Sequence, residues 1–177
     1  MDVSQYLEIF IDETSEHLQN LSDCIMELEK DPENMDTINE IFRAAHSLKG
    51  MAGTMGFKRM QRLTHDMENV FQEVRSEKVK VTSSMIDLLF KCLDAIEGYL
   101  DNVKASSDEG TEDNELIIKE LNDFIAAEED IAEILQSPFT SLISDATYPG
   151  GRLHPRVYGS VARLLETYVG KREILTL

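Results

Sequence analysis

The sequence predicts an all-α fold: an antiparallel four-helix bundle with a fifth, peripheral helix, followed by a poorly packed C-terminal extension. In the first 104 residues, apolar side chains recur at three- and four-residue steps through four long segments. Short polar connections separate these segments, and helices joined in this way pack best as antiparallel neighbours. The chain of 177 residues is 42% hydrophobic and 29% charged, which is typical of a domain with an ordered core.

The predicted helices have recognisable ends. The first stops before Pro32, and Thr82 or Ser83 can cap the start of the fourth. Polar, acidic residues 105–114 have the composition of a linker, and residues 115–130 are expected to form the fifth helix. The four segments that carry the helical periodicity are 4–30, 35–55, 58–76 and 83–104. The residues expected to point inward include Phe42 in the second segment, Met60, Leu63, Met67, Val70, Phe71 and Val74 in the third, and Met85, Leu89, Cys92, Leu93, Ile96, Leu100 and Val103 in the fourth. In the fifth, the apolar residues are Leu116, Ile117, Leu121, Phe124 and Ile125.

Charge is distributed unevenly along the chain. The net charge is −17, so binding to nucleic acid or to an anionic membrane is not expected, because phosphate would be repelled. Residues 1–130 carry a net charge of −18 (30 acidic, 12 basic), whereas residues 131–177 carry +1 (4 acidic, 5 basic). This asymmetry indicates two parts of different origin, with a joint near 128–131.

The two cysteines, Cys24 and Cys92, both fall among apolar positions. They are interpreted as reduced core residues of a cytoplasmic protein rather than as a disulfide. No apolar run reaches 18 residues and the N-terminus is too acidic for a signal peptide, so membrane insertion is not expected.

The stretch IFRAAHSLKGMAGTMG in the second predicted helix holds His46 and three glycines, although each glycine inside a helix costs roughly 1 kcal/mol relative to alanine. On a helical wheel, His46 lies outside the apolar stripe, and Lys49 and Gly50 occupy the same surface patch. Gly50 and Gly53 would leave this surface bare, so that a partner can approach the imidazole closely. An exposed histidine beside a lysine suggests nucleophilic chemistry toward an anion.

The third predicted helix supplies a carboxylate for this histidine. Glu68, in LTHDMEN, falls at the edge of that helix's apolar face, and His65 lies one turn earlier. If the two helices are antiparallel neighbours, Glu68 can accept a hydrogen bond from His46 and fix its tautomer. A metal site built from these residues and His17 is disfavoured because paired E-x-x-H sets are absent, so no metal or cofactor is expected; His17 is interpreted as a structural residue.

The motifs AAHSLKGMAGTMGF and LTHDMEN resemble the histidine phosphotransfer domain of the bacterial chemotaxis histidine kinase CheA, over about residues 1–127. The resemblance implies that His46 is the phosphoacceptor, Lys49 a cation beside the phosphate, and His65 and Glu68 a supporting hydrogen-bond network. It also implies two partners, the ATP-binding domain of a chemotaxis histidine kinase and receiver-domain response regulators. A module of this kind is not itself an enzyme. The alternative is a non-catalytic helical interaction module.

Residues 131–177 have a different character. ISDATYP and LHPRVYGSVARLLETYV resemble a C-terminal stretch of D-aminoacylase-type amidohydrolases, which implies that Asp145 matches a general base and that His154, Pro155 and Arg156 match a family motif. The metal ligands of such enzymes are missing, so an active amidohydrolase remnant is the least favoured interpretation.

Overall fold

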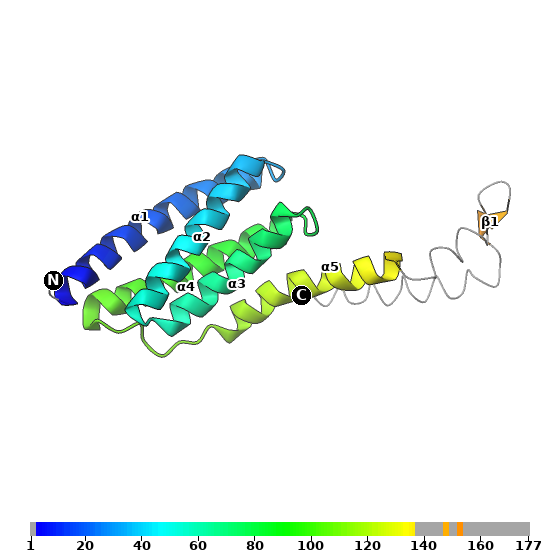
Figure 1. The fold of residues 1–177 in the computed structure, drawn as a ribbon. Coiled ribbons are helices and arrows are strands. Elements are labelled where there is room, and N and C mark those ends of the chain that lie inside the picture. The colour runs from blue at the N-terminus through cyan, green and yellow to red at the C-terminus, as the bar shows by residue number, and fades with distance from the viewer. Residues whose placement is uncertain (1–2, 137–146, 149–151, 154–177) are drawn as a thin grey trace. The chain divides into compact units, whose positions relative to one another are not determined.

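The computed structural model describes residues 3–136, 147–148 and 152–153, and the chain divides into two compact units, Met1–Glu128 and Glu129–Leu177. The first unit is a bundle of long helices (Figure 1). Its helices are α1 (Val3–Lys30), α2 (Met35–Met55), α3 (Lys58–Arg75), α4 (Ser83–Ser106) and the first part of α5 (Glu115–Gln136).

The four-helix arrangement confirms the predicted fold class. α2 packs against both α1 and α3, and α4 completes the bundle by packing against α1 and α3. All residues predicted to point inward from α3 and α4 are buried, because their three- and four-residue spacing keeps them on one face. Cys24 and Cys92 are buried free thiols, as expected.

Local sequence explains where the helices begin and end. The side chain of Asn34 accepts hydrogen bonds from the first turn of α2, and Thr82 caps α4 by accepting one from the Met85 amide. Gly56 ends α2 with φ = 81°, a left-handed conformation that is costly for residues with a side chain. Gly56, one of the three glycines near His46, is therefore required by the end of the helix.

The fifth helix differs from its prediction. α5 continues to Gln136, six residues beyond the predicted end, because AAEEDIAEILQ contains no helix breaker before Pro138. Two residues at its start, Ile118 and Leu121, are buried against the bundle core, whereas the apolar Leu116 is 77% exposed. The helix therefore attaches to the bundle through one side of its first two turns.

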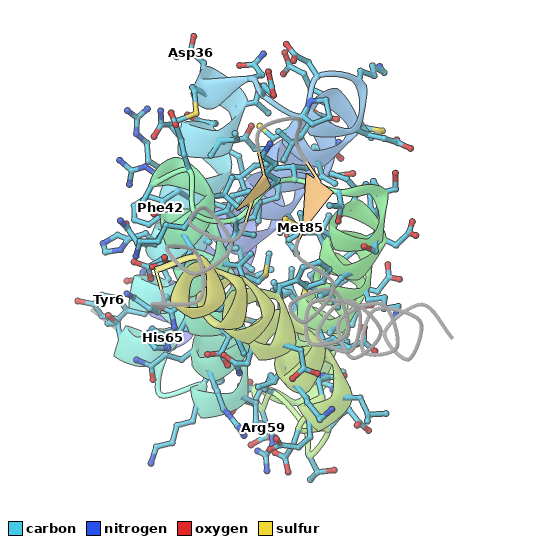
Figure 2. All side chains as sticks on the ribbon, turned by 90° about the vertical axis from the view of Figure 1, so that its right-hand side faces the viewer. Tyr6, Asp36, Phe42, Arg59, His65 and Met85 are labelled. Atoms are coloured by element: carbon cyan, nitrogen blue, oxygen red, sulfur yellow. The ribbon has the colours of Figure 1, made fainter. Side chains whose placement is uncertain are left out.

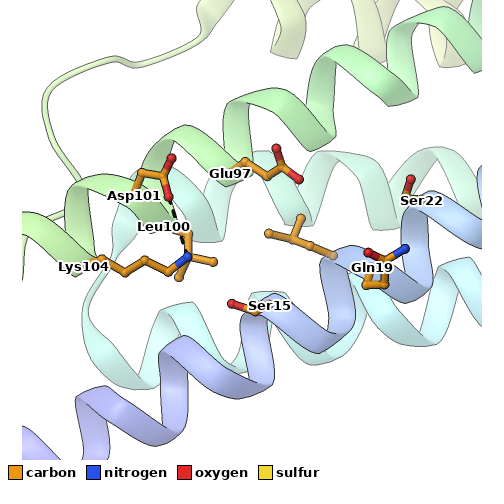
Figure 3. A pocket seen from close by; sticks show the side chains of 8 residues that line it. Ser15, Gln19, Ser22, Glu97, Leu100, Asp101 and Lys104 are labelled. Atoms are coloured by element: carbon orange, nitrogen blue, oxygen red, sulfur yellow. Dashed lines mark ion pairs between the residues drawn. The ribbon is translucent and has the colours of Figure 1, made fainter.

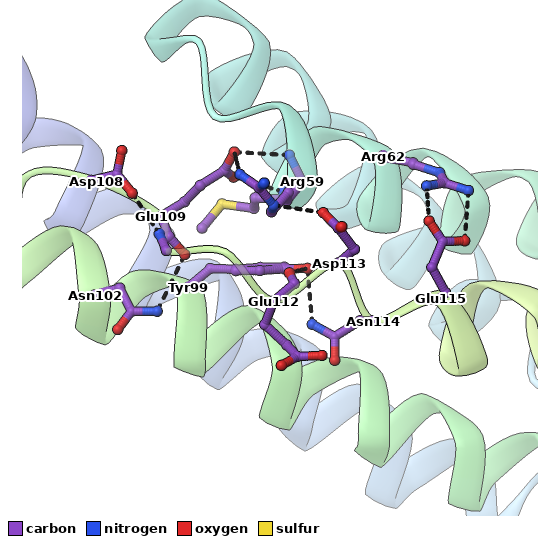
Figure 4. Close-up of polar contacts among 12 residues, drawn as sticks. Arg59, Arg62, Tyr99, Asn102, Asp108, Glu109, Glu112, Asp113, Asn114 and Glu115 are labelled. Carbon is purple, nitrogen blue, oxygen red and sulfur yellow. Dashed lines mark hydrogen bonds and ion pairs between the residues drawn. The ribbon is translucent and has the colours of Figure 1, made fainter.

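The segment predicted as an acidic linker is ordered, and we call residues 107–114 the acidic strap. α3 starts without a capping side chain, since Phe57 precedes it. Glu109 supplies the missing acceptor from the strap: its carboxylate accepts hydrogen bonds from the amides of Arg59 and Met60, both at 2.9 Å (Figure 4). Only 6% of Glu109 is exposed. A carboxylate at this position also interacts favourably with the helix dipole.

Further contacts attach the strap to α3 and α4. Arg59 pairs with Asp113 at 2.6 Å, and the Tyr99 hydroxyl donates to the carbonyl oxygen of Glu112 at 2.9 Å. Asn114 in turn donates to the Tyr99 hydroxyl at 2.8 Å. The strap thus joins the start of α3 to the end of α4 (Figure 4).

Replacing Glu109 by alanine is expected to lower the free energy of unfolding by about 2 kcal/mol, because the variant loses a helix cap and leaves two amides without acceptors. Urea denaturation of both proteins measures the difference. Glu112→Ala is the matched control, since the exposed Glu112 engages Tyr99 through its backbone alone. Equal stability of the Glu109 and Glu112 variants would contradict the capping role.

Little of the predicted C-terminal extension is described. In the second unit, β1 (Thr147–Tyr148) pairs with β2 (Arg152–Leu153) in an antiparallel ladder. Asp145 and the His154-Pro155-Arg156 motif lie outside the described residues, as does most of 137–177.

Candidate functional site

His46 stands on the outer surface of α2 and contacts a carboxylate from α3. Its side chain is 63% exposed, in agreement with its predicted place outside the apolar stripe. The imidazole Nδ1 lies 2.8 Å from Oε1 of Glu68. The short corner between the two helices makes them antiparallel neighbours, and this arrangement brings together two residues that are 22 positions apart.

Glu68 connects His46 to Lys49. Its second oxygen, Oε2, lies 2.5 Å from the Lys49 ammonium, and 13% of the Glu68 side chain is exposed. Burial raises the pKa of Glu68, but the hydrogen bond from His46 and the hydrogen bond and charge of Lys49 outweigh it, so the pKa lies below its usual range. The carboxyl group is therefore ionised at neutral pH.

This ionised carboxylate determines which imidazole nitrogen carries the proton. A carboxylate can only accept, so the Nδ1 of His46 must donate to it. In the neutral ring the lone pair then resides on Nε2. The site therefore presents Nε2 as a nucleophile, because Glu68 fixes the tautomer of the imidazole ring.

An aromatic ring borders the imidazole on α2. The ring of Phe42, one turn before His46, lies nearly parallel to the imidazole, with centroids 6.3 Å apart and planes at 20°. The Arg75 guanidinium of α3 lies 4.3 Å above the Phe42 ring. Phe42 was predicted to be a core residue, but it is only half-buried, and neither Phe42 nor Arg75 was predicted to belong to the site. The i, i+4 spacing of Phe42 and His46 was the available signal.

The two glycines predicted to permit close approach have different surroundings. A Cβ atom added at Gly50 would meet nothing within 4 Å, so the surface beside His46 is open there. At Gly53 an added Cβ would lie 2.6 Å from the amide nitrogen of Gln61. Gly53 therefore accommodates a side chain of α3 rather than leaving bare surface.

His65 lies on the same flank of the bundle as Phe42, where α2 and α3 run side by side (Figure 2). It is 53% exposed, and its Nδ1 is 3.8 Å from the carboxylate of its neighbour Asp66. This contact differs from the predicted one with the His46–Glu68 pair. His17 is half-buried on α1, consistent with a structural residue.

The comparisons with known proteins agree with this geometry. The model of the family described as "Hpt domain" matches residues 5–106, a range that includes the helices carrying His46 and Glu68. The chain belongs to the Hpt domain family. This family covers the bundle and excludes α5 and the second unit.

Relatives of this Hpt domain are chemotaxis proteins. The chain is 46% identical over 103 residues to the chemotaxis protein CheA of Bacillus subtilis, covering 58% of this chain and 15% of the relative. The solution structure of the histidine phosphotransfer domain of CheA is 42% identical, with a TM-score of 0.65 over 70% of this chain and 93% of that one. The phosphorylated P1 domain of CheA3, solved in complex with CheY6 from R. sphaeroides, shares the fold (TM-score 0.64, covering 69% and 96%) at 20% identity.

The Hpt domain accounts for only a small share of the relatives, since the match spans about one sixth of the length of the chemotaxis proteins. The resemblance of residues 131–177 to D-aminoacylases is not supported by the comparisons. Within the described part of the chain, no helix combines the length and the apolar character needed to cross a membrane.

Proposed function

We propose that His46 is the phosphoacceptor of this Hpt domain and that the domain carries a phosphoryl group between a kinase and a response regulator. The observation that carries the proposal is the 2.8 Å contact between Nδ1 of the exposed His46 and the ionised Glu68. It leaves Nε2 facing away from the carboxylate, with a lone pair available for attack.

In the loading step, Nε2 of His46 attacks the γ-phosphorus of ATP held by a kinase domain. The new N–P bond forms as the bond to the β-phosphate oxygen breaks, and ADP leaves with that electron pair. Nδ1 keeps its proton, and Glu68 stabilises the positive charge that develops on the ring. Positioning and charge neutralisation dominate phosphoryl transfer, and both would come largely from the partner's own site.

In the unloading step, a carboxylate oxygen of a receiver-domain aspartate attacks the phosphorus, and the N–P bond breaks. The electron pair returns to Nε2 and the imidazole becomes neutral again. The CheA3 P1 domain, which shares the fold, was solved in phosphorylated form with CheY6, and this motivates a receiver domain as the partner. Lys49 reaches the phosphoryl group only by turning from Glu68, so we assign it first to holding that carboxylate.

Incubation with the kinase core of a chemotaxis histidine kinase and γ-labelled ATP tests the proposal. The chain should take up acid-labile, base-stable label, as expected of phosphohistidine, and should lose it when a receiver domain is added. A chain that binds the kinase core but takes up no label would instead be a non-catalytic interaction module.

A further inference from the structure

Among the surface hollows in the described part of the chain, two of about 260 Å³ each differ in charge. The hollow between α1 and α4 is lined by the acidic Glu97 and Asp101, and its one lysine, Lys104, pairs with Asp101 at 3.7 Å (Figure 3). Serines, a glutamine and two leucines form the rest of this lining. Nothing in this hollow selects a ligand.

The second hollow has no acidic lining residue, although the chain has a net charge of −17. We call it the basic groove. It offers the ammonium, guanidinium, amide and imidazole donors of five residues at the junction of α2 and α3: Lys49, Lys58, Gln61, Arg62 and His65. Such a concentration of donors in an acidic protein favours an anion as the ligand.

The basic groove is continuous with the site at His46. Lys49 lines the groove and also lies 2.5 Å from Glu68, which contacts the imidazole. Along α3, Arg62 precedes Glu68 by six residues, about 9 Å at the helical rise. An anion in the groove would therefore lie beside a reactant bound at His46 rather than on it.

Part of the groove is available to an anion, although Lys49 already pairs with Glu68. The side chain of Gln61 packs against Gly53 of α2, and a side chain at position 53 would displace it. Gly53 therefore leaves space for Gln61, which lines the groove. Arg62 donates hydrogen bonds to both carboxylate oxygens of Glu115, so an anion would have to replace Glu115 there; the pair is exposed on both sides (52% and 62%), and exposed pairs are readily exchanged for another anion. Lys58 is exposed and has no carboxylate partner among the described residues.

We propose that the basic groove binds the phosphate chain of the donor nucleotide while its γ-phosphoryl group is transferred to His46. This inference rests on the proposed function, because it concerns the loading step of that reaction. A compact polyanion suits a hollow of this size better than an extended acidic protein face does, and the planar fork of Arg62 matches phosphate oxygens.

Direct binding is tested with inorganic pyrophosphate added to the isotopically labelled full chain. We expect saturable amide shifts across Lys58–Arg62, and the Lys58→Ala/Arg62→Ala variant should bind at least about fivefold more weakly. The matched control, Lys104→Ala/Lys119→Ala, removes the same charge from exposed positions elsewhere and should bind as the unmodified chain does. Absence of saturable shifts would overturn the proposal, and melting curves of both variants verify that they are folded.

Kinetics shows which of the two transfer steps uses the groove, and the pyrophosphate experiment shows whether a phosphate chain binds in it. The Lys58/Arg62 variant should lose at least about fivefold in kcat/KM for phosphorylation by the kinase core, but should pass its label to a receiver domain at the normal rate. Equal losses in both steps would overturn the proposal in favour of an acidic protein surface, and no loss in either would also overturn it. If the unmodified chain binds pyrophosphate but takes up no label, the phosphoacceptor function fails instead.

Discussion

Replacing His46 by glutamine is expected to abolish phosphorylation of the chain while leaving the bundle intact. Glutamine can still donate a hydrogen bond to Glu68, but it has no nucleophilic nitrogen. Because the His46 side chain is 63% exposed, the free energy of unfolding should change by no more than about 1 kcal/mol. Label uptake from γ-labelled ATP and urea denaturation measure the two quantities.

His17→Gln is the control for the His46 variant. It makes the same chemical change at a half-buried position of α1 that has no part in the proposed reaction. It should retain the label, and a chain with His46→Gln that is still labelled would place the phosphoryl group on another residue.

Replacing Glu68 by glutamine should slow phosphorylation by roughly 10- to 100-fold, the range found when a group that orients a reactive histidine is removed. The neutral amide no longer compels Nδ1 to carry the proton, and the ion pair with Lys49 is lost. The loss should appear in kcat rather than in the KM for the kinase, because Glu68 is largely covered and touches the imidazole, not the partner.

The same variant has a signature in the pH dependence of stability. The pKa of Glu68 is lower in the folded chain than its ordinary value, so its ionisation stabilises the fold above that ordinary value, and the contribution is lost as pH falls through the folded pKa. The difference in unfolding free energy between the unmodified chain and Glu68→Gln should therefore shrink below about pH 4. A difference that stays constant from pH 7 to pH 3 would show that Glu68 has an ordinary pKa.

Periodicity alone was sufficient to predict the central pair of the site. The apolar stripes of α2 and α3 fix which way His46 and Glu68 face, and a corner of two residues leaves the helices no arrangement but antiparallel contact. The buried faces of α3 and α4 were predictable for the same reason.

Contacts that depend on the conformation of a long side chain could not be predicted from helical periodicity. The pairing of Lys49 with Glu68 was not predicted, since a long flexible side chain turns to the nearest covered carboxylate; its role beside a phosphate stays a prediction. Glu109 is 49 positions from Met60, and composition marked its segment only as acidic and polar. The exposure of Leu116 was not predictable, because a short apolar stripe at the end of a domain does not define which side of the helix is buried.

The cap that Glu109 gives to α3 bears on how the domain can be excised. A fragment cut after α4 would keep all four helices of the bundle and both His46 and Glu68. However, the backbone amides at the start of α3 would lose their hydrogen-bond acceptor, and the core would lack Ile118 and Leu121. A fragment of this chain that keeps the acidic strap and the start of α5 is therefore expected to be more stable than one cut after α4, at the end of the family match.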